Sequence, residues 1–330
     1  MKLFYFPGNN FGDNLNSWLW ERLLPGAWNG DGRVMLSGIG TIISNHMPKA
    51  KSWIVLGSGA GYLPPPKDFG GPGWNVLCVR GPLSAKVFGL PPEKAITDGA
   101  IYLSLLPECA PLPEDRRHGI VFMPHHLALR RGHWQEACAM AGIELIDPTG
   151  DSHEILARLR SAKLVIADAM HAAIVADTLR VPWIPVATSP QINVFKWLDW
   201  TLSMSVPYEP VVLPSSSRQE ALESWFWKFR GEKHFLDERT PEAAIEHFRK
   251  MRWIKERFWW IPLRKAVSLT YKTAALFLSF DGNPAKDQPY VEKAAEALRK
   301  VAEGKAYLSD TDVFEKKKKK MIDCLDRIRA

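Results

Sequence analysis

The chain is poor in cysteine and lacks the spacings in which cysteine carries structure or chemistry. Its 330 residues include four cysteines, and no two of them form a C-x-x-C pair. They are Cys78, Cys109, Cys138 and Cys324. Disulfide frameworks and cysteine-based zinc modules need paired or regularly spaced cysteines, so the sequence argues against both and favours a reducing compartment.

Long apolar runs are missing as well. No stretch approaches the ~20 apolar residues that span a bilayer, and the longest candidate, 273–280, is far too short. The apolar residues 1–6 end at a Pro-Gly turn and are too few for the core of a signal peptide, so they predict a first β-strand. We therefore expect a cytoplasmic protein, with peripheral contact to the inner face of the inner membrane as an option.

Positive charge is concentrated in one part of the chain. The net charge is +7, and residues 239–280 alone contain nine Lys or Arg against three Glu, a net charge of +6. This excess implies an anionic partner, such as a phosphate compound, a membrane surface or a nucleic acid. The sequence contains no recognised nucleic-acid module, so we expect no nucleic acid as partner.

Apolar runs that end in turns alternate with helical patterns over the first two thirds of the chain. The predicted strands are 3–6, 52–56, 76–79, 100–103, 119–123, 144–146, 163–167 and a short or edge strand at 181–186. The predicted helices are 14–24, 82–88, 134–142, 153–161 and 170–179. This order predicts two Rossmann-like α/β lobes, 1–112 and 113–214, with a Pro-rich linker at 107–117. Residues 215–330 are basic and rich in tryptophan, and they predict a helical extension that packs on the lobes.

The turn after the first strand is a candidate ligand site, because open α/β sheets bind ligands beyond the carboxyl ends of their strands. It contains Asn9, Asn10, Gly12 and Asp13 just before a helix. Glycines let the backbone approach a ligand closely, and the amides of a helix N-terminus attract anions. The alternative is a plain helix cap formed by Asp13 or Asn14.

Two further strand ends carry groups suited to anions. Gly57, Ser58 and Gly59 follow a buried strand, and alternating glycines suit close packing against phosphate. They match neither a Walker loop nor a dinucleotide fingerprint. Arg80 follows the next strand and offers bidentate contacts to phosphate or carboxylate. The alternatives are a tight turn and an ordinary surface arginine.

A histidine at the start of an apolar helix is the sharpest feature of the sequence. His171 follows Met170 after a buried strand, and a helix N-terminus disfavours the charged imidazolium. The residue is suited to donate a hydrogen bond or a proton, or to hold phosphate; the alternative is a core histidine. His125 and His126 follow another strand, without the further ligands that a metal site needs. Lys196 is a candidate donor to phosphate or to an acceptor sugar.

These motifs occur in an order that resembles the polysaccharide pyruvyltransferase family, especially the branch that adds pyruvate ketals to bacterial exopolysaccharide sugars. The matching pieces are 8–15, 57–59, 80–84, 97–100, 123–126 and 170–182. Many members of the family read Arg-Leu-His-Gly where this chain reads Ala169-Met170-His171-Ala172. The donor contact usually given to that arginine must then come from Arg80 or Lys196.

The resemblance implies a fold similar to the two-lobed GT-B glycosyltransferases, with phosphoenolpyruvate as donor substrate and no cofactor. It implies a cyclic ketal formed across two hydroxyls of a sugar, release of phosphate, and a lipid-linked oligosaccharide as acceptor. We expect His171 to be the general acid or phosphate partner, Arg80 and the 57–59 loop to clamp the anion, and Asp13 to be a candidate base. The remaining expected substrate-binding residues are Asn9, Asn10, Gly12, Asp98, His125, His126, Met170 and Lys196. A GT-B-like glycosyltransferase that uses a nucleotide sugar is the alternative.

Overall fold

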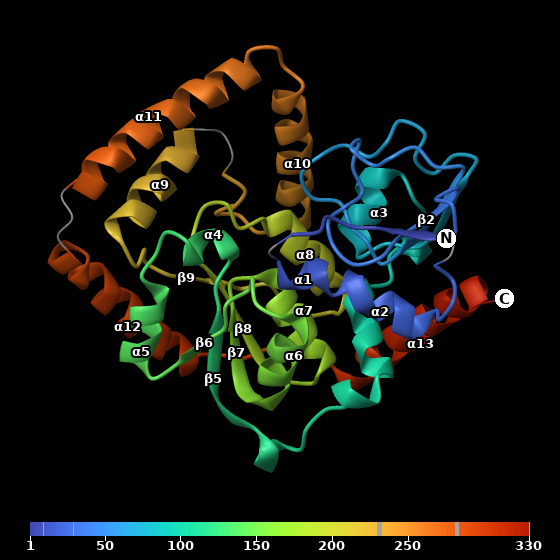
Figure 1. Ribbon diagram of the computed structural model, residues 1–330, viewed down its shortest axis with the longest axis horizontal. Coiled ribbons are helices and arrows are strands. Elements are labelled where there is room, and N and C mark those ends of the chain that lie inside the picture. The colour runs from blue at the N-terminus through green and yellow to red at the C-terminus, as the bar shows by residue number, and fades with distance from the viewer. Residues whose placement is uncertain (9, 29, 230–232, 281–283, 330) are drawn as a thin grey trace.

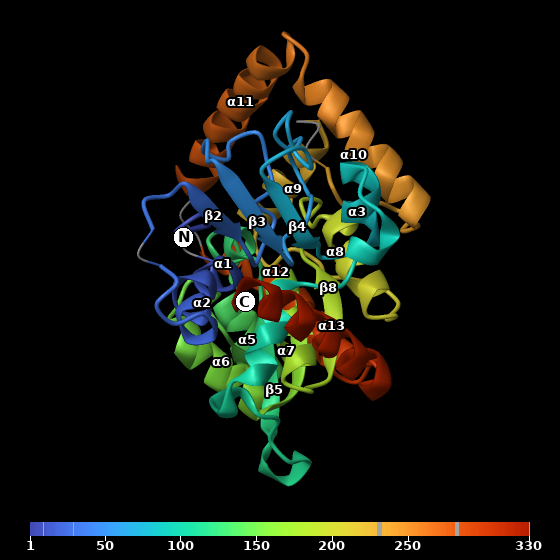
Figure 2. The same cartoon turned by 90° about the vertical axis from the view of Figure 1, so that its right-hand side faces the viewer.

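The first half of the chain forms a parallel sheet with strand order β1-β2-β3-β4, and Figure 2 shows β2, β3 and β4 side by side. The computed structural model describes all residues except 9, 29, 230–232, 281–283 and 330 (Figure 1). The strands are β1 (Lys2–Phe4), β2 (Val34–Ser37), β3 (Ser52–Leu56) and β4 (Trp74–Cys78). The helices are α1 (Phe11–Asn14), α2 (Asn16–Leu23) and α3 (Pro82–Phe88), with a short 3-10 helix η1 (Pro92–Lys94).

Two expectations for this half are corrected, and one strand, β2, was not predicted. The predicted helix 14–24 is two helices that begin at Phe11, because Asn10 caps the first of them by accepting a hydrogen bond from the Gly12 amide. The predicted strand 100–103 lies in a 3-10 helix, η2 (Gly99–Leu105), because Asp98 accepts the Ala100 amide at 2.9 Å and starts a helical turn.

The second half forms a parallel sheet with strand order β6-β5-β7-β8-β9. Its strands are β5 (His118–Met123), β6 (Glu144–Leu145), β7 (Ala162–Ala167), β8 (Trp183–Ala187) and β9 (Val211–Val212). Its helices are α4 (His126–Leu129), α5 (Trp134–Ala141), α6 (Ser152–Ser161), α7 (Met170–Thr178) and α8 (Val194–Ser203). Strand β8 contains Pro185 and is preceded by Pro182; it lies one position from the edge of the sheet, next to the two-residue edge strand β9. The linker carries the 3-10 helices η3 (Pro107–Cys109) and η4 (Glu114–Arg116).

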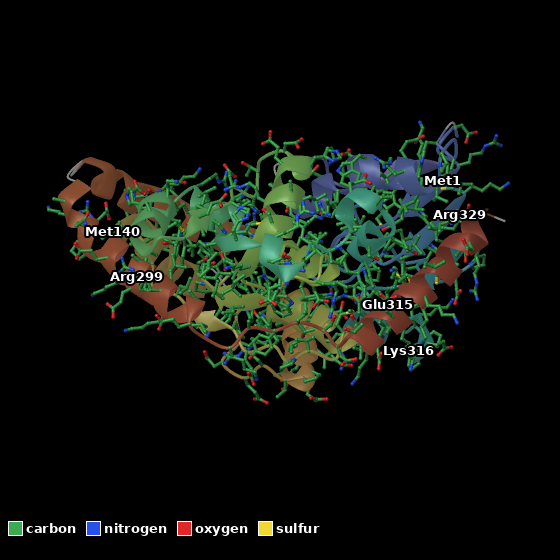
Figure 3. All side chains as sticks on the ribbon, turned by 90° about the horizontal axis from the view of Figure 1, so that it is seen from below. Met1, Met140, Arg299, Glu315, Lys316 and Arg329 are labelled. Atoms are coloured by element: carbon green, nitrogen blue, oxygen red, sulfur yellow. The ribbon has the colours of Figure 1, made fainter. Side chains whose placement is uncertain are left out.

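The rest of the chain is helical, as expected, but it divides between the two sheets. Its elements are α9 (Arg218–Phe229), α10 (Pro241–Lys255), α11 (Trp260–Phe280), η5 (Pro284–Lys286), α12 (Gln288–Ala302) and α13 (Thr311–Arg329). Helix α12 packs on α5 of the second sheet, whereas α13 packs on η2 and β4. Figure 3 shows the result: Arg299 lies by Met140 at one end of the molecule, and Arg329 lies by Met1 at the other. Arg329 donates to the Leu23 carbonyl at 3.0 Å, which fastens the C-terminal helix to the first half.

One hydrophobic core runs through both halves. It joins residues of the first sheet, such as Leu36 and Leu56, to residues of the second, such as Val121 and Val165. Helix α7 is buried along its whole length and packs on η2, so it lies at the junction. The loops at the carboxyl ends of the two sheets are therefore held close together. The lobe boundaries after residues 112 and 214 stay predictions.

Candidate active site

A cavity of about 300 Å³ lies where the two halves meet, and residues from both halves line it. We call it the central cavity. The first half contributes Phe6, Asn10, Asp13, Thr41, Ile42, Ile43, Ser44, Tyr62 and Leu63. The second half contributes His125, His126, His171 and Lys196. Phe6 and Asn10 follow β1, His125 follows β5 and His171 follows β7, so the cavity lies at the carboxyl ends of parallel strands, where such sheets bind ligands.

His171 stands at the start of α7 with a buried carboxyl group behind it. Its Nε2 lies 4.0 Å from Oδ2 of Asp98, and both atoms are buried and lack a hydrogen-bond partner in the described part of the chain. Burial, followed by the charges of Lys196 and Arg80, lowers the pKa of His171 to about 3. Burial raises the pKa of Asp98 to about 6. The structure thus places a neutral imidazole at the cavity with a carboxyl group next to its inner nitrogen.

Gly12 is required by this histidine. A Cβ atom added at Gly12 would lie 1.9 Å from Nδ1 of His171, a distance that no real contact permits. The glycine therefore lets α1 approach the ring, and a hydrogen bond from the Phe11 amide to the Pro148 carbonyl (2.8 Å) ties the start of α1 to the second half. The sequence predicted a close approach of this glycine to a ligand; what the structure shows is a close approach to the His171 ring, and Gly12 is not among the cavity residues.

Asn10 and Asp13 form one unit on the wall of the cavity. Asn10 is the cap of α1, in place of Asp13 or Asn14, and its Nδ2 donates to Oδ2 of Asp13 at 3.0 Å. Burial raises the pKa of Asp13, while Lys196 and Asn10 oppose the rise. A carboxylate of raised pKa beside a cavity is suited to accept a proton. Asn9 lies outside the described residues.

Lys196, on α8, brings positive charge into the cavity. Its Nζ lies 5.0 Å from the centre of the Tyr62 ring, a cation–π contact. No salt bridge to this lysine is found among the described residues. Its charge contributes to lowering the pKa values of His125 and His126, in each case after burial. The ammonium group is therefore placed to receive an anion.

Arg80 does not reach the cavity. It is fully buried, and its three guanidinium nitrogens donate to Asp199 Oδ2 (2.9 Å), Thr41 Oγ1 (2.9 Å) and the Ala60 carbonyl (2.6 Å). Asp199 is on the same helix as Lys196, and Thr41 lines the cavity. Arg80 thus positions groups of the site through the fold, and the expected anion clamp is not formed by its side chain.

The glycine loop at 57–59 also serves packing. The buried Ser58 hydroxyl donates to the Gly38 carbonyl at 2.6 Å. A Cβ atom at Gly57 would lie 2.5 Å from the Gly99 amide nitrogen, and one at Gly59 would lie 2.4 Å from the Arg80 guanidinium carbon. None of the three loop residues lines the central cavity. The expectation of a phosphate loop is therefore not met by this geometry.

The adjacent histidines, His125 and His126, both line the cavity, with ring centres 4.3 Å apart. The His125 amide donates to Oδ2 of Asp168 at 2.8 Å, and Thr188 Oγ1 donates to the same oxygen at 2.7 Å. Asp168 therefore fixes the turns after β5 and β8. Met170 is buried at the start of α7 and is not among the cavity residues. Within the described ranges, no group of three His, Cys, Asp or Glu could hold a metal ion.

Two parts of the site escaped the sequence reasoning. Thr41 to Ser44 line the cavity because they follow β2, the strand that was not predicted. The apolar run Val34–Ser37 before a Gly-Ile-Gly turn was the available signal. Tyr62 was also missed, since it lies between Gly61 and the prolines 64–66 without a signal of its own; it lines the cavity and contacts Lys196.

Two comparisons with known proteins gave matches. A family model described as polysaccharide pyruvyl transferase matches residues 112–190, which include His125, His126 and His171. The chain is 39% identical over 225 residues to the succinoglycan biosynthesis protein ExoV of Rhizobium meliloti (strain 1021), covering 67% of this chain and 71% of that protein. No solved structure matches the chain. Among the described helices, none is both long and apolar enough to cross a membrane.

Proposed function

The chain belongs to the polysaccharide pyruvyltransferase family, and on that premise we propose that it transfers pyruvate from phosphoenolpyruvate to two hydroxyls of a sugar. The acceptor is an exopolysaccharide precursor, the product is a cyclic ketal, and phosphate is released. The observation that carries this proposal is the meeting of His171, Asp13 and Lys196 at one cavity, with Asp98 behind the histidine. The donor is a substrate, and the proposed reaction uses no cofactor.

The proposed reaction needs an anion site and three proton transfers. One sugar hydroxyl adds to C2 of the enol, and the methylene carbon takes up a proton and becomes a methyl group. The second hydroxyl then displaces phosphate, which leaves with the proton of that hydroxyl. In our proposal Lys196 binds the donor's phosphate or carboxylate, Asp13 accepts a hydroxyl proton, and His171 protonates the methylene carbon.

The charge of the donor resolves an apparent conflict in this assignment. Burial and nearby cations hold His171 neutral, with its pKa lowered to about 3, whereas a general acid must carry a proton. Bound phosphoenolpyruvate would offset the charge of Lys196 and add negative charge beside the ring, which favours the imidazolium. Asp98, close to Nε2, would stabilise that form further. The histidine would thus become protonated only with donor in place.

Mass spectrometry of oligosaccharide acceptors incubated with phosphoenolpyruvate tests the reaction. We expect a product heavier by one ketal-linked pyruvate, with one phosphate released per product. A product that carries an added sugar from a nucleotide sugar would instead support the glycosyltransferase alternative. Protection against heating by phosphoenolpyruvate, compared with nucleotide sugars, provides a second reading of donor choice.

The two lobes support a GT-B-like arrangement as part of this proposal. Each lobe has a parallel sheet, the shared cavity lies at the carboxyl ends of both, and the last helix returns to the first lobe. An experimental structure with phosphoenolpyruvate bound between the lobes would test it. Donor bound wholly within one lobe would contradict it.

We propose that the turn between α10 and α11 contacts an anionic membrane peripherally. At that membrane the protein would bind a lipid-linked acceptor. The turn lies far from both sheets (Figure 1); Phe258 in the turn is 91% exposed, and Ile261 at the start of α11 is 61% exposed. Arg257 lies 3.8 Å over the Trp253 ring, and other cations on the same pair of helices are exposed. Apolar side chains among cations suit the interface of an anionic bilayer.

Vesicle sedimentation tests this contact. We expect the wild-type protein to sediment with phosphatidylglycerol vesicles and to remain in solution with phosphatidylcholine vesicles. Phe258→Ser with Ile261→Ser should weaken sedimentation, while the exposed Leu308→Ser, which lies outside the turn, should not. Equal sedimentation of both variants would contradict the assignment of the turn.

A further inference from the structure

A second cavity, of about 390 Å³, adjoins the central one. The two share four lining residues: Tyr62, Leu63, His125 and His126. Beyond this shared wall the second cavity is lined by Leu127, Gln191, Trp227, His234 and Lys255. A ligand in the second cavity would therefore lie next to any donor held by Lys196 and His171.

Tyr62 forms the junction of the two cavities. Lys196, from the central cavity, lies 5.0 Å from its ring centre, and Lys255, from the second cavity, lies 5.9 Å from it. Lys255 Nζ also donates to the Tyr62 carbonyl at 3.4 Å, and the His234 ring meets the Tyr62 ring edge to face at 5.4 Å. These contacts hold the Tyr62 side chain at the boundary between the central cavity and the second cavity.

The lining of the second cavity suits a sugar. No carboxylate is among its lining residues, so it is poorly suited to a cation. It offers the flat ring of the half-buried Trp227, the ring of Tyr62 and the amide of Gln191. Pockets for small molecules combine apolar or aromatic walls with a few polar groups that fix orientation. A pyranose presents a flat C–H face to a ring and hydroxyls to an amide.

We propose that the second cavity binds the acceptor oligosaccharide, with Trp227 as the surface on which a sugar ring stacks and Gln191 as a partner of its hydroxyls. This inference rests on the proposed function. The acceptor enters from the side of α9 and α10, and its reacting hydroxyls pass Tyr62 and the two histidines to reach the donor. Lys255, a lining residue of this cavity, ends α10 and lies three positions before the exposed Phe258.

Steady-state kinetics of two tryptophan variants tests the inference. The probe is the oligosaccharide pool released from unpyruvylated exopolysaccharide, with phosphoenolpyruvate as donor. Trp227→Ala should raise the KM for this acceptor by about tenfold, the loss expected for one aromatic contact, and leave the KM for phosphoenolpyruvate unchanged. Trp225→Ala is the matched control, since Trp225 is on the same helix, is 53% exposed and does not line the cavity.

Two further variants keep the test decisive. Trp227→Phe retains a flat ring and should restore most of the acceptor affinity. Gln191→Ala should raise the acceptor KM alone, without removing a side chain of α9. If Trp227→Ala and Gln191→Ala both keep the wild-type acceptor KM, or if only the KM for phosphoenolpyruvate changes, the inference is overturned. Failure of the wild-type protein to transfer pyruvate would instead refute the proposed function.

Discussion

The turn that contains Arg80 and the turn that leads to His171 have the same local design, a buried strand followed by a polar side chain and a helix. At the Arg80 turn the hydrogen bonds of the side chain stay within the protein, because all three guanidinium nitrogens donate to protein oxygens. The His171 turn leaves Nε2 and the facing oxygen of Asp98 without hydrogen-bond partners in the described part of the chain. A charged or polar residue at a strand end can therefore serve binding or structure. The two roles are distinguished by whether its polar atoms already have hydrogen-bond partners inside the protein.

The largest effect is expected at His171. Loss of a general acid typically slows catalysis by about 10²–10⁴-fold, so His171→Gln should reduce kcat by this factor. The wild-type midpoint of thermal unfolding should be nearly kept, because glutamine can replace the ring as a polar group. Rates of ketal formation and circular dichroism melts measure the two quantities. Near-normal turnover would place the acid elsewhere in the cavity.

Arg80 should show the opposite behaviour, a loss of stability. Arg80→Met leaves the buried Asp199 carboxylate without its ion partner, and breaking a buried pair in this way costs about 3–5 kcal/mol. Urea unfolding of the variant measures the change in the free energy of unfolding. The control is Arg33→Met, which removes a pair whose arginine side chain is 74% exposed and should change stability by less than about 1 kcal/mol. A stable Arg80→Met variant with lost donor binding would restore the anion-clamp hypothesis.

Lys196 should contribute to donor binding and hardly to stability, in contrast to Arg80. Hydrogen bonds to charged groups contribute about 1.5–3 kcal/mol, so Lys196→Met should raise the KM for phosphoenolpyruvate by about 10–100-fold. Stability should hardly change, since no salt bridge to this lysine is found among the described residues. Lys163→Met, at an exposed position of β7, is the control. An unaltered KM in the Lys196 variant would remove it from the donor site.

Local signals explain which elements could be predicted from the sequence. Helix α3 begins and ends where expected because Pro82 occupies its first turn and Gly89 closes it with φ +69°. The end of α5 at Gly142, with φ +71°, follows the same rule. The run 100–103 is apolar in the way that a buried strand is, and only the hydrogen bond from the Ala100 amide to Asp98 makes it a 3-10 helix.

The candidate site was predictable mainly where a strand end carried its own signal. Asp13, His125, His126 and His171 were predicted in this way and line the central cavity, whereas Lys196, which also lines it, was predicted only as a possible donor to phosphate or sugar. The partners of Arg80 and the facing of Asp98 toward His171 are contacts between segments far apart in the chain. They arise from the packing of α7 on η2 and of α8 on α3, which no local spacing encodes.

The smallest expected effect is the pH dependence of stability that His171 causes. Burial lowers the pKa of His171 from 6.5 to about 3, so below pH 6.5 the unfolded chain binds a proton that the folded protein does not. Stability is therefore lost as the pH falls, by about 2 kcal/mol between pH 6.5 and pH 5 from this one group. Urea unfolding at the two pH values measures the free energy of unfolding. Its decrease in acid should be smaller for His171→Gln than for the wild type, and should be unchanged for the control His118→Gln, at an exposed position.

Asp98 acts in the opposite sense. Its pKa is raised to about 6, so its protonated form stabilises the folded protein as the pH falls toward 4. If His171→Gln lost as much stability in acid as the wild type, the ring would already be charged in the folded protein. His171 would then form an internal ion pair with Asp98, as Arg80 does with Asp199.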